Sequence, residues 1–317
     1  MRRAILAGLA LIAVQAIFVA GGHKAKANRW GEGYFPNLPV VNQDGKTLHF
    51  YDDLIKGRIV VVSFIFTTCA DLCPIETARL AEVKEMLGDV VGRDISFLSI
   101  TVDPEHDTPD TLKAFADAYD AGPGWNFVTG KPEDIKAILA KFGDRSGERG
   151  LSSHRNEIML GNDPVGDWQR DSTFGDIDSL AMTIRAMDPQ WTALARQPQQ
   201  HVKASDTGYR IGEQPGEAMF AKLCAPCHTI GAGDRIGPDL RGVTERRDQA
   251  WLTDFIRYPQ KKIAEKDAVA LALASQFPAA LMPRLGVTES DATDLIAYLR
   301  DQTPRSSVSA RSVTAPR

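Results

Sequence analysis

Cysteine is scarce in this sequence of 317 residues, and its distribution is unusual. The four cysteines form two tight pairs, Cys69 with Cys73 and Cys224 with Cys227. No cysteine is left over to cross-link distant loops, which excludes a small scaffold that depends on disulfides. We therefore expect both pairs to serve chemistry, either redox chemistry or the binding of a metal or cofactor.

A basic excess and long apolar runs are also missing from most of the chain. The 37 Lys and Arg residues face 41 Asp and Glu residues, and no basic stripe is present, so nucleic acid is not an expected partner. The one long apolar run, residues 4–20, follows Arg2 and Arg3 and precedes a small-x-small site at 25–27. Residues 1–27 are therefore predicted to be a signal peptide or an uncleaved N-terminal anchor. We expect a periplasmic protein, either soluble or tethered to the inner membrane through residues 4–20.

The first cysteine pair follows an apolar stretch. Apart from Ser63, residues 60–66 are β-branched or aromatic, without polar alternation, which predicts a central strand covered on both faces. Pro74 suits the first turn of a helix, and apolar residues then recur at helical spacing up to Gly88. Cysteines four apart in a helical turn have Cα atoms about 6 Å apart, which permits a disulfide or two thiolates on one metal ion. A buried apolar pair or a structural disulfide is the alternative.

Strands alternate with helices between residues 33 and 188, which predicts an α/β domain with a largely parallel sheet. We expect a hairpin over 40–50, strands over 95–102, 125–128 and 157–160, and helices beginning near 109, 132 and 177. His154 lies in a loop just before one of these strands and is the candidate third metal ligand. His49 and His106 are expected to be surface residues.

Three motifs in this region resemble the Sco/SenC family of copper-binding, thioredoxin-like proteins. They are T-T-C-A-D-L-C-P at 67–74, V-D-P-E-H-D-T-P at 102–109, and S-H at 153–154 with I-M-L-G-N-D at 158–163. The chain departs from the family at His106, where arginine is usual, and at Ser153, where aspartate is usual. The resemblance implies a thioredoxin-like domain over 33–188, with copper bound by Cys69, Cys73 and His154. Two soft thiolates and an imidazole also suit copper on chemical grounds.

A polar segment at 189–207, expected to be a linker, separates this region from the second cysteine pair. Cys224, Cys227 and His228 form C-x-x-C-H, the motif for covalent attachment of haem c, with the histidine as an iron ligand. The order of this motif, G-P-D-L at 237–240, Met282-Pro283 and a C-terminal helix resembles class I cytochromes c over 208–302. Met282 is the only methionine after His228 and is the candidate second iron ligand. Residues 303–317 are predicted to be a disordered tail.

The combined prediction is an α/β thioredoxin-like domain followed by a small all-α cytochrome c domain. The resemblance implies a copper-binding assembly factor for the copper centre of cytochrome c oxidase, with subunit II of the oxidase or another copper protein as its client. We expect the haem to exchange electrons with the copper/thiol site, and a cytochrome or copper protein to be the redox partner. Such a protein is a metallochaperone or electron carrier rather than a classical enzyme.

Two alternatives remain open at this stage. One is a thiol–disulfide oxidoreductase that uses Cys69 and Cys73 without metal, and the other is a copper or redox sensor or a simple electron carrier. Counting electrons favours copper, because haem and copper each exchange one electron whereas a disulfide needs two.

Overall fold

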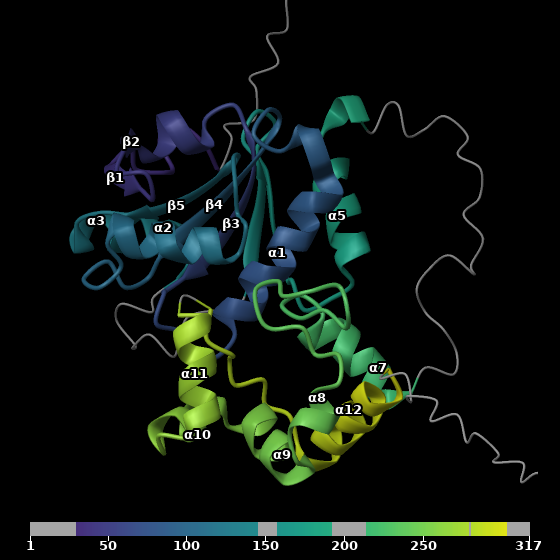
Figure 1. Ribbon diagram of the computed structural model, residues 1–317. Coiled ribbons are helices and arrows are strands. Elements are labelled where there is room, and N and C mark those ends of the chain that lie inside the picture. Colours follow the sequence, from purple (N-terminus) through teal and green to yellow (C-terminus); the bar gives the residue numbers. More distant parts are fainter. Residues whose placement is uncertain (1–29, 145–156, 192–213, 279, 303–317) are drawn as a thin grey trace, which may run out of the picture.

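The structure is a computed structural model that describes residues 30–144, 157–191, 214–278 and 280–302 (Figure 1). The expected export segment, most of the expected linker, the expected tail and His154 lie outside these residues. Within the described ranges, no helix is long and apolar enough to cross a membrane.

The N-terminal domain is built on a seven-stranded mixed sheet with the order β2-β1-β5-β4-β3-β6-β7. Its strands are β1 (Pro39–Asn42), β2 (Thr47–His49), β3 (Ile59–Ile65), β4 (Ile95–Thr101), β5 (Trp125–Thr129), β6 (Ile158–Asn162) and β7 (Asp167–Asp171). The expectation of a largely parallel sheet is right for β3, β4 and β5 only. Hairpins add antiparallel strands at both edges, where β1 pairs with β5 and β6 pairs with β3.

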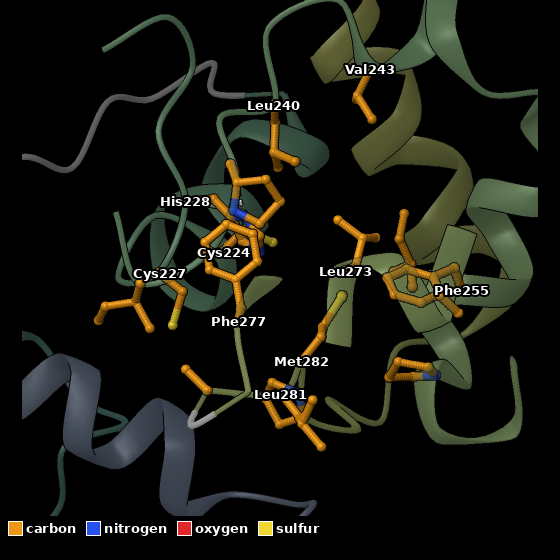
Figure 2. Close-up of a pocket in the computed structure, with 18 of the residues that line it drawn as sticks. Cys224, Cys227, His228, Leu240, Val243, Phe255, Leu273, Phe277, Leu281 and Met282 are labelled. Carbon is orange, nitrogen blue, oxygen red and sulfur yellow. Dashed lines mark hydrogen bonds between the residues drawn. The ribbon is translucent and has the colours of Figure 1, made fainter. Parts of the chain in front are cut away.

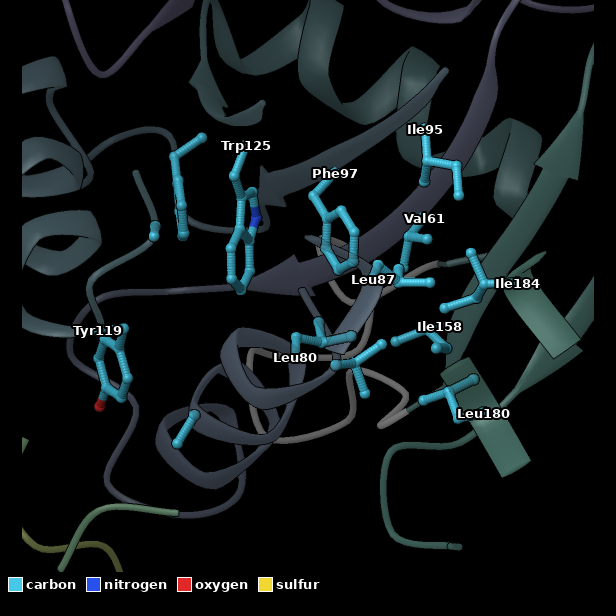
Figure 3. Packing of buried hydrophobic residues seen from close by; sticks show 14 of the residues in the cluster. Val61, Leu80, Leu87, Ile95, Phe97, Tyr119, Trp125, Ile158, Leu180 and Ile184 are labelled. Atoms are coloured by element: carbon cyan, nitrogen blue, oxygen red, sulfur yellow. The ribbon is translucent and has the colours of Figure 1, made fainter. Parts of the chain in front are cut away.

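Strand β3 lies inside the sheet and is covered on both faces, as its nearly continuous apolar sequence predicts. All seven of its side chains are buried. Val61 packs in the cluster that also contains side chains of α1 (Cys73–Leu87), α2 (Pro109–Ala118) and α5 (Ile177–Ala186), part of which is drawn in Figure 3. Val60 and Val62 face the opposite cluster, which includes α3 (Pro132–Phe142). The cysteine-bearing segment therefore begins at a rigid, fully buried strand.

The C-terminal region is helical. Its elements are α7 (Pro215–Met219), a π-helical turn (Phe220–Cys224), α8 (Val243–Arg246), α9 (Gln249–Arg257), α10 (Pro259–Ala264), α11 (Ala268–Gln276) and α12 (Glu289–Asp301). A reciprocal capping box between Thr288 and Asp291 starts α12, which is the C-terminal helix expected from the sequence. The apolar face of α12 packs with Phe220 in a separate small core. Helices α10 and α11 were not predicted.

Helix α1 belongs to the N-terminal domain and also contacts the helical C-terminal region. The buried Arg79 donates hydrogen bonds from Nε to the carbonyl of Thr173, from Nη2 to that of Gly175 at 2.7 Å, and from Nη1 to that of Lys222 at 2.8 Å. One turn further on, Glu82 pairs with Arg235 of the helical region at 3.3 Å. The two domains therefore pack directly against each other along α1 (Figure 1).

Replacing Arg79 should test this arrangement. Arg79→Met keeps an unbranched apolar stem but removes the donors for three carbonyls, so we expect the free energy of unfolding to fall by about 2–4 kcal/mol. Urea unfolding of the full chain measures the change. Arg93→Met is the matched control, because Arg93 is exposed and pairs only with its neighbour Asp94, and it should cost no more than about 0.5 kcal/mol. Equal losses in the two variants would contradict the structural role of Arg79.

Candidate redox sites

The loop that carries the first cysteine pair joins β3 to α1. Cys73 is the first residue of α1 and Pro74 lies in its first turn, as predicted. Cys69 corrects one expectation, because it lies in the preceding loop rather than in a helical turn. Its N–H donates to the carbonyl of Phe66 at 3.1 Å, which makes a tight turn at the end of the strand. The two cysteines are therefore brought together by a loop closing on a helix start.

A buried carboxylate fixes the start of this loop. Asp107 accepts hydrogen bonds from the Thr67 N–H at 3.1 Å and from the Thr67 hydroxyl at 2.6 Å, and it also accepts one from the Thr101 hydroxyl. Burial raises the pKa of Asp107, and these hydrogen bonds oppose the rise. This role of Asp107 was not predicted from the sequence, although the residue belongs to the second motif, at 102–109.

The two thiols of the first pair are buried and unequal. Neither takes part in a disulfide bond. A hydrogen bond from the Cys73 thiol lowers the pKa of Cys69 to about 7, although burial opposes the change. The same hydrogen bond raises the pKa of Cys73, and burial raises it further. Near neutral pH the pair can therefore hold one negative charge, on Cys69, and it offers two soft donors to a metal ion.

His154 is outside the described residues, so the predicted set of Cys69, Cys73 and His154 stays a prediction. Among the residues with described positions, no three His, Cys, Asp or Glu side chains form a metal cluster. His49 and His106 are exposed and lie beside Asp53 and Asp103, as expected for surface histidines.

A second carboxyl group lies close to the thiol pair and was not singled out from the sequence. Glu76 belongs to the first turn of α1 and is only 2% exposed. Its Oε1 has no hydrogen-bond partner within the described part of the chain. Burial, with a smaller effect of charge on Cys69, raises the pKa of Glu76 to about 8. The group is therefore mostly a neutral acid at pH 7, which keeps a second negative charge away from the thiols.

The second cysteine pair lines a largely apolar cavity of about 380 Å³ in the helical region (Figure 2). Cys224, Cys227, His228 and Met282 all contribute to its wall. His228 Nδ1 lies 2.8 Å from the carbonyl oxygen of Pro238. A carbonyl oxygen can only accept, so Nδ1 carries the proton and Nε2 keeps its lone pair. Burial lowers the pKa of His228 and favours this neutral form.

The residues around the cavity fit a c-type haem. Burial raises the pKa of Cys224 and of Cys227 to about 12, so both remain neutral thiols before any covalent bond forms. A Cβ atom at Gly237 would lie 2.6 Å from Cε1 of His228, so only glycine allows the loop to support the imidazole this closely. Met282 lines the cavity from a different segment, and Figure 2 shows its thioether inside. The donor set is that of a haem with histidine and methionine ligands.

One wall of the cavity is made by residues that adjoin the first cysteine pair in the sequence or pack near it, and we call it the shared wall. Pro74 and Ile75, which directly follow Cys73, line the cavity together with Tyr119 at the end of α2. The loop between the two cysteines also touches the helical region, because the carbonyl of Ala70 accepts from the backbone N–H of Arg284 at 2.8 Å. No sequence motif predicts these contacts, because each of them depends on how the two domains pack against each other.

Comparison with known proteins identifies both regions. Residues 35–160 match the SCO1/SenC family model and residues 213–303 match the cytochrome c family model. A SCO1 protein homolog of Bacillus subtilis is 38% identical over 90 residues, which are 28% of this chain and 45% of that protein. The chain spans about half the length of most curated relatives that it matches.

Two solved structures are similar to about half of the chain. A SCO1/SenC family lipoprotein from Bacillus anthracis is 27% identical, with a TM-score of 0.43, over 50% of this chain and 95% of its own. Arabidopsis thaliana ScoI with copper bound is 25% identical, with a TM-score of 0.40, over 48% of this chain and 96% of its own. The family-model matches agree with both motif-based predictions and with the order of the two regions. This chain therefore joins a region that matches the SCO1/SenC family model to a region that matches the cytochrome c family model.

Proposed function

We propose that this chain is an exported copper-handling protein whose haem domain exchanges electrons with the copper site. Copper is held by Cys69, Cys73 and His154, and haem c is attached through Cys224 and Cys227, with His228 and Met282 as iron ligands. The proposed role is assembly of the copper centre of cytochrome c oxidase, with subunit II of the oxidase or another copper protein as client. A cytochrome or a copper protein serves as the outside redox partner.

The case for copper starts from the paired thiols. Their sulfur atoms are held within hydrogen-bonding reach of each other, and Cys69 ionises near neutral pH. Little free energy is therefore needed to bring the two thiols together as thiolate ligands of a soft metal ion. Asp107 fixes the loop on one side through Thr67. Such a preformed pair suits a metal that has to be bound and later released.

The observation that carries the proposed electron exchange is the shared wall between the two sites. Pro74 and Ile75 line the cavity and adjoin Cys73 in sequence. When bound, haem supplies a one-electron couple, which matches the one-electron Cu(II)/Cu(I) couple. The chain itself excludes water with an apolar lining, holds His228 in the tautomer that can bind iron, and keeps the two sites in contact. Two unrelated modules that were merely exported together would need none of these contacts.

A thiol–disulfide oxidoreductase is the second candidate, and the unequal thiols favour it. A low pKa at Cys69 beside a high pKa at Cys73 is what an attacking thiol and a resolving thiol require. Glu76 offers a nearby proton. Metal analysis separates the two candidates, because thiol exchange alone needs no copper.

We expect the purified, exported protein to bind about one copper ion per chain with Cys69, Cys73 and His154 as ligands. His154→Ala should lower copper affinity by at least about tenfold, since losing even a residue that supports a ligand costs that much. Cys69→Ser should nearly abolish binding. Competition with a chelator of known affinity measures both effects, and His49→Ala is the matched control. An unchanged affinity and Cu(II) spectrum in His154→Ala would remove His154 from the site.

The haem ligands are tested separately. Met282→Ala should leave haem covalently attached but lower its potential by on the order of 0.1 V, within the roughly 0.8 V range set by axial ligands. The physical reason is that thioether ligation raises the potential. Optical spectroscopy and redox titration give the readouts, with Met219→Ala, outside the cavity lining, as control. If both variants keep the wild-type spectrum, Met282 is not a ligand.

Electron exchange is tested by stopped-flow mixing of protein with reduced haem that carries Cu(II). Haem oxidation should be fast and independent of protein concentration, because donor and acceptor belong to one chain. It should disappear in Cys69→Ser, which cannot hold copper. A rate that rises in proportion to protein concentration would show that electrons pass between molecules, and the proposal of an intramolecular exchange would fail.

A further inference from the structure

The carbonyl of Ala70 lies between the two cysteines of the thiol pair and is unusually placed. Ala70 lies in the loop before Leu72, the N-cap of α1, so its carbonyl is not one that the helix uses. The oxygen accepts from two groups of the helical domain, the backbone N–H of Arg284 at 2.8 Å and Nε2 of Gln260 at 3.3 Å. A backbone group beside Cys69 is thus bound by the other domain.

The donors at the other end belong to the segment that carries the candidate iron ligand. Arg284 follows Met282 by two residues, and Met282 lines the haem cavity. Gln260, on α10, donates through the same Nε2 to the carbonyl of Met282 at 2.8 Å. One half-buried side chain therefore holds together the backbone beside Cys69 and the backbone of Met282.

We propose that this contact is the route by which electrons pass between the two sites, an inference that rests on the proposed function. The route runs from Cys69 to the Ala70 carbonyl, across one hydrogen bond to the N–H of Arg284, and through Pro283 to Met282. Every other link is covalent, and electronic coupling decays less steeply through bonds than across a gap. Gln260 is a positioning residue that keeps the hydrogen bond closed.

The electron balance is simple. One electron leaves Fe(II), giving Fe(III), and reduces Cu(II) to Cu(I). No proton has to move, which agrees with a route made of backbone groups. The outside redox partner then restores Fe(II) with one electron.

The direct test removes a single N–H. Arg284→Pro lacks the backbone donor, whereas Arg284→Ala keeps it and loses only the side chain. Residues 281–287 form no regular helix or strand and Arg284 has no positive φ, so proline at 284 removes no helix or strand hydrogen bond and meets no left-handed backbone. In the copper-loaded stopped-flow experiment, Arg284→Pro should slow intramolecular haem oxidation by about tenfold, as expected for losing the one non-covalent link, and Arg284→Ala by less than about twofold.

A second pair of variants tests the positioning role without relying on the proline. Gln260→Glu keeps the side-chain size but is ionised at pH 7 and cannot donate. Gln249→Glu makes the same change on α9, where the side-chain oxygen of Gln249 accepts a hydrogen bond from Arg300. A glutamate at 249 can still accept that hydrogen bond. In the copper-free protein, Gln260→Glu should speed amide hydrogen exchange at Arg284 by about fivefold, the effect of weakening one hydrogen bond, and Gln249→Glu should not. Gln260→Glu should also slow haem oxidation.

The outcomes separate this inference from the proposed function. If wild-type protein shows no concentration-independent haem oxidation, the proposed function fails and the route fails with it. If wild type is fast, and Arg284→Pro with an intact methionine–iron spectrum and Gln260→Glu are equally fast, only the route is overturned. If Arg284→Pro loses the methionine–iron signature, Gln260→Glu decides. Slowing in Tyr119→Leu alone would place the route through that buried ring instead.

Discussion

The packing of helix α1 is the constraint on which both sites depend. Its first turn supplies Cys73 to the thiol pair and Pro74 and Ile75 to the cavity wall. Further along, Arg79 holds carbonyls of both domains. A helix rises a fixed 1.5 Å per residue and bends little over two turns, so it sets the spacing between thiol pair and cavity. The apolar core under β3 holds the helix in place and thereby positions both sites.

Much of this arrangement was predictable from sequence because it is local. The nearly continuous apolar run in β3, Pro74 at the start of α1 and the capping box before α12 each follow from short-range preferences. Strand β7 was missed because its polar sequence, Asp-Trp-Gln-Arg-Asp, lacks an apolar alternation. The contacts of Arg79 and Gln260 were missed because both look like surface side chains until a second domain supplies or orients their partners.

Electron exchange and metal delivery make different demands on this geometry. An electron crosses a closed contact, and the hydrogen bond on Ala70 provides one. A copper ion passed to another protein needs its ligands to be reached from outside, yet Cys69 and Cys73 are both buried. Delivery to a client therefore requires the loop at 66–72 or the domain contact to open. On the proposed function, the contact that would carry electrons to copper would also hold the ion back until a client displaced it.

The shared wall also bears on the order in which haem attachment and domain docking would take place. Pro74, Ile75 and Tyr119 close one side of a cavity whose other residues come from the C-terminal domain. The haem of the proposed function would occupy this cavity and be attached to Cys224 and Cys227, so a wall supplied by the other domain would restrict its entry. On that proposal, haem attachment would come before the two domains dock. The final contact between the domains would then mark a molecule that already holds its cofactor.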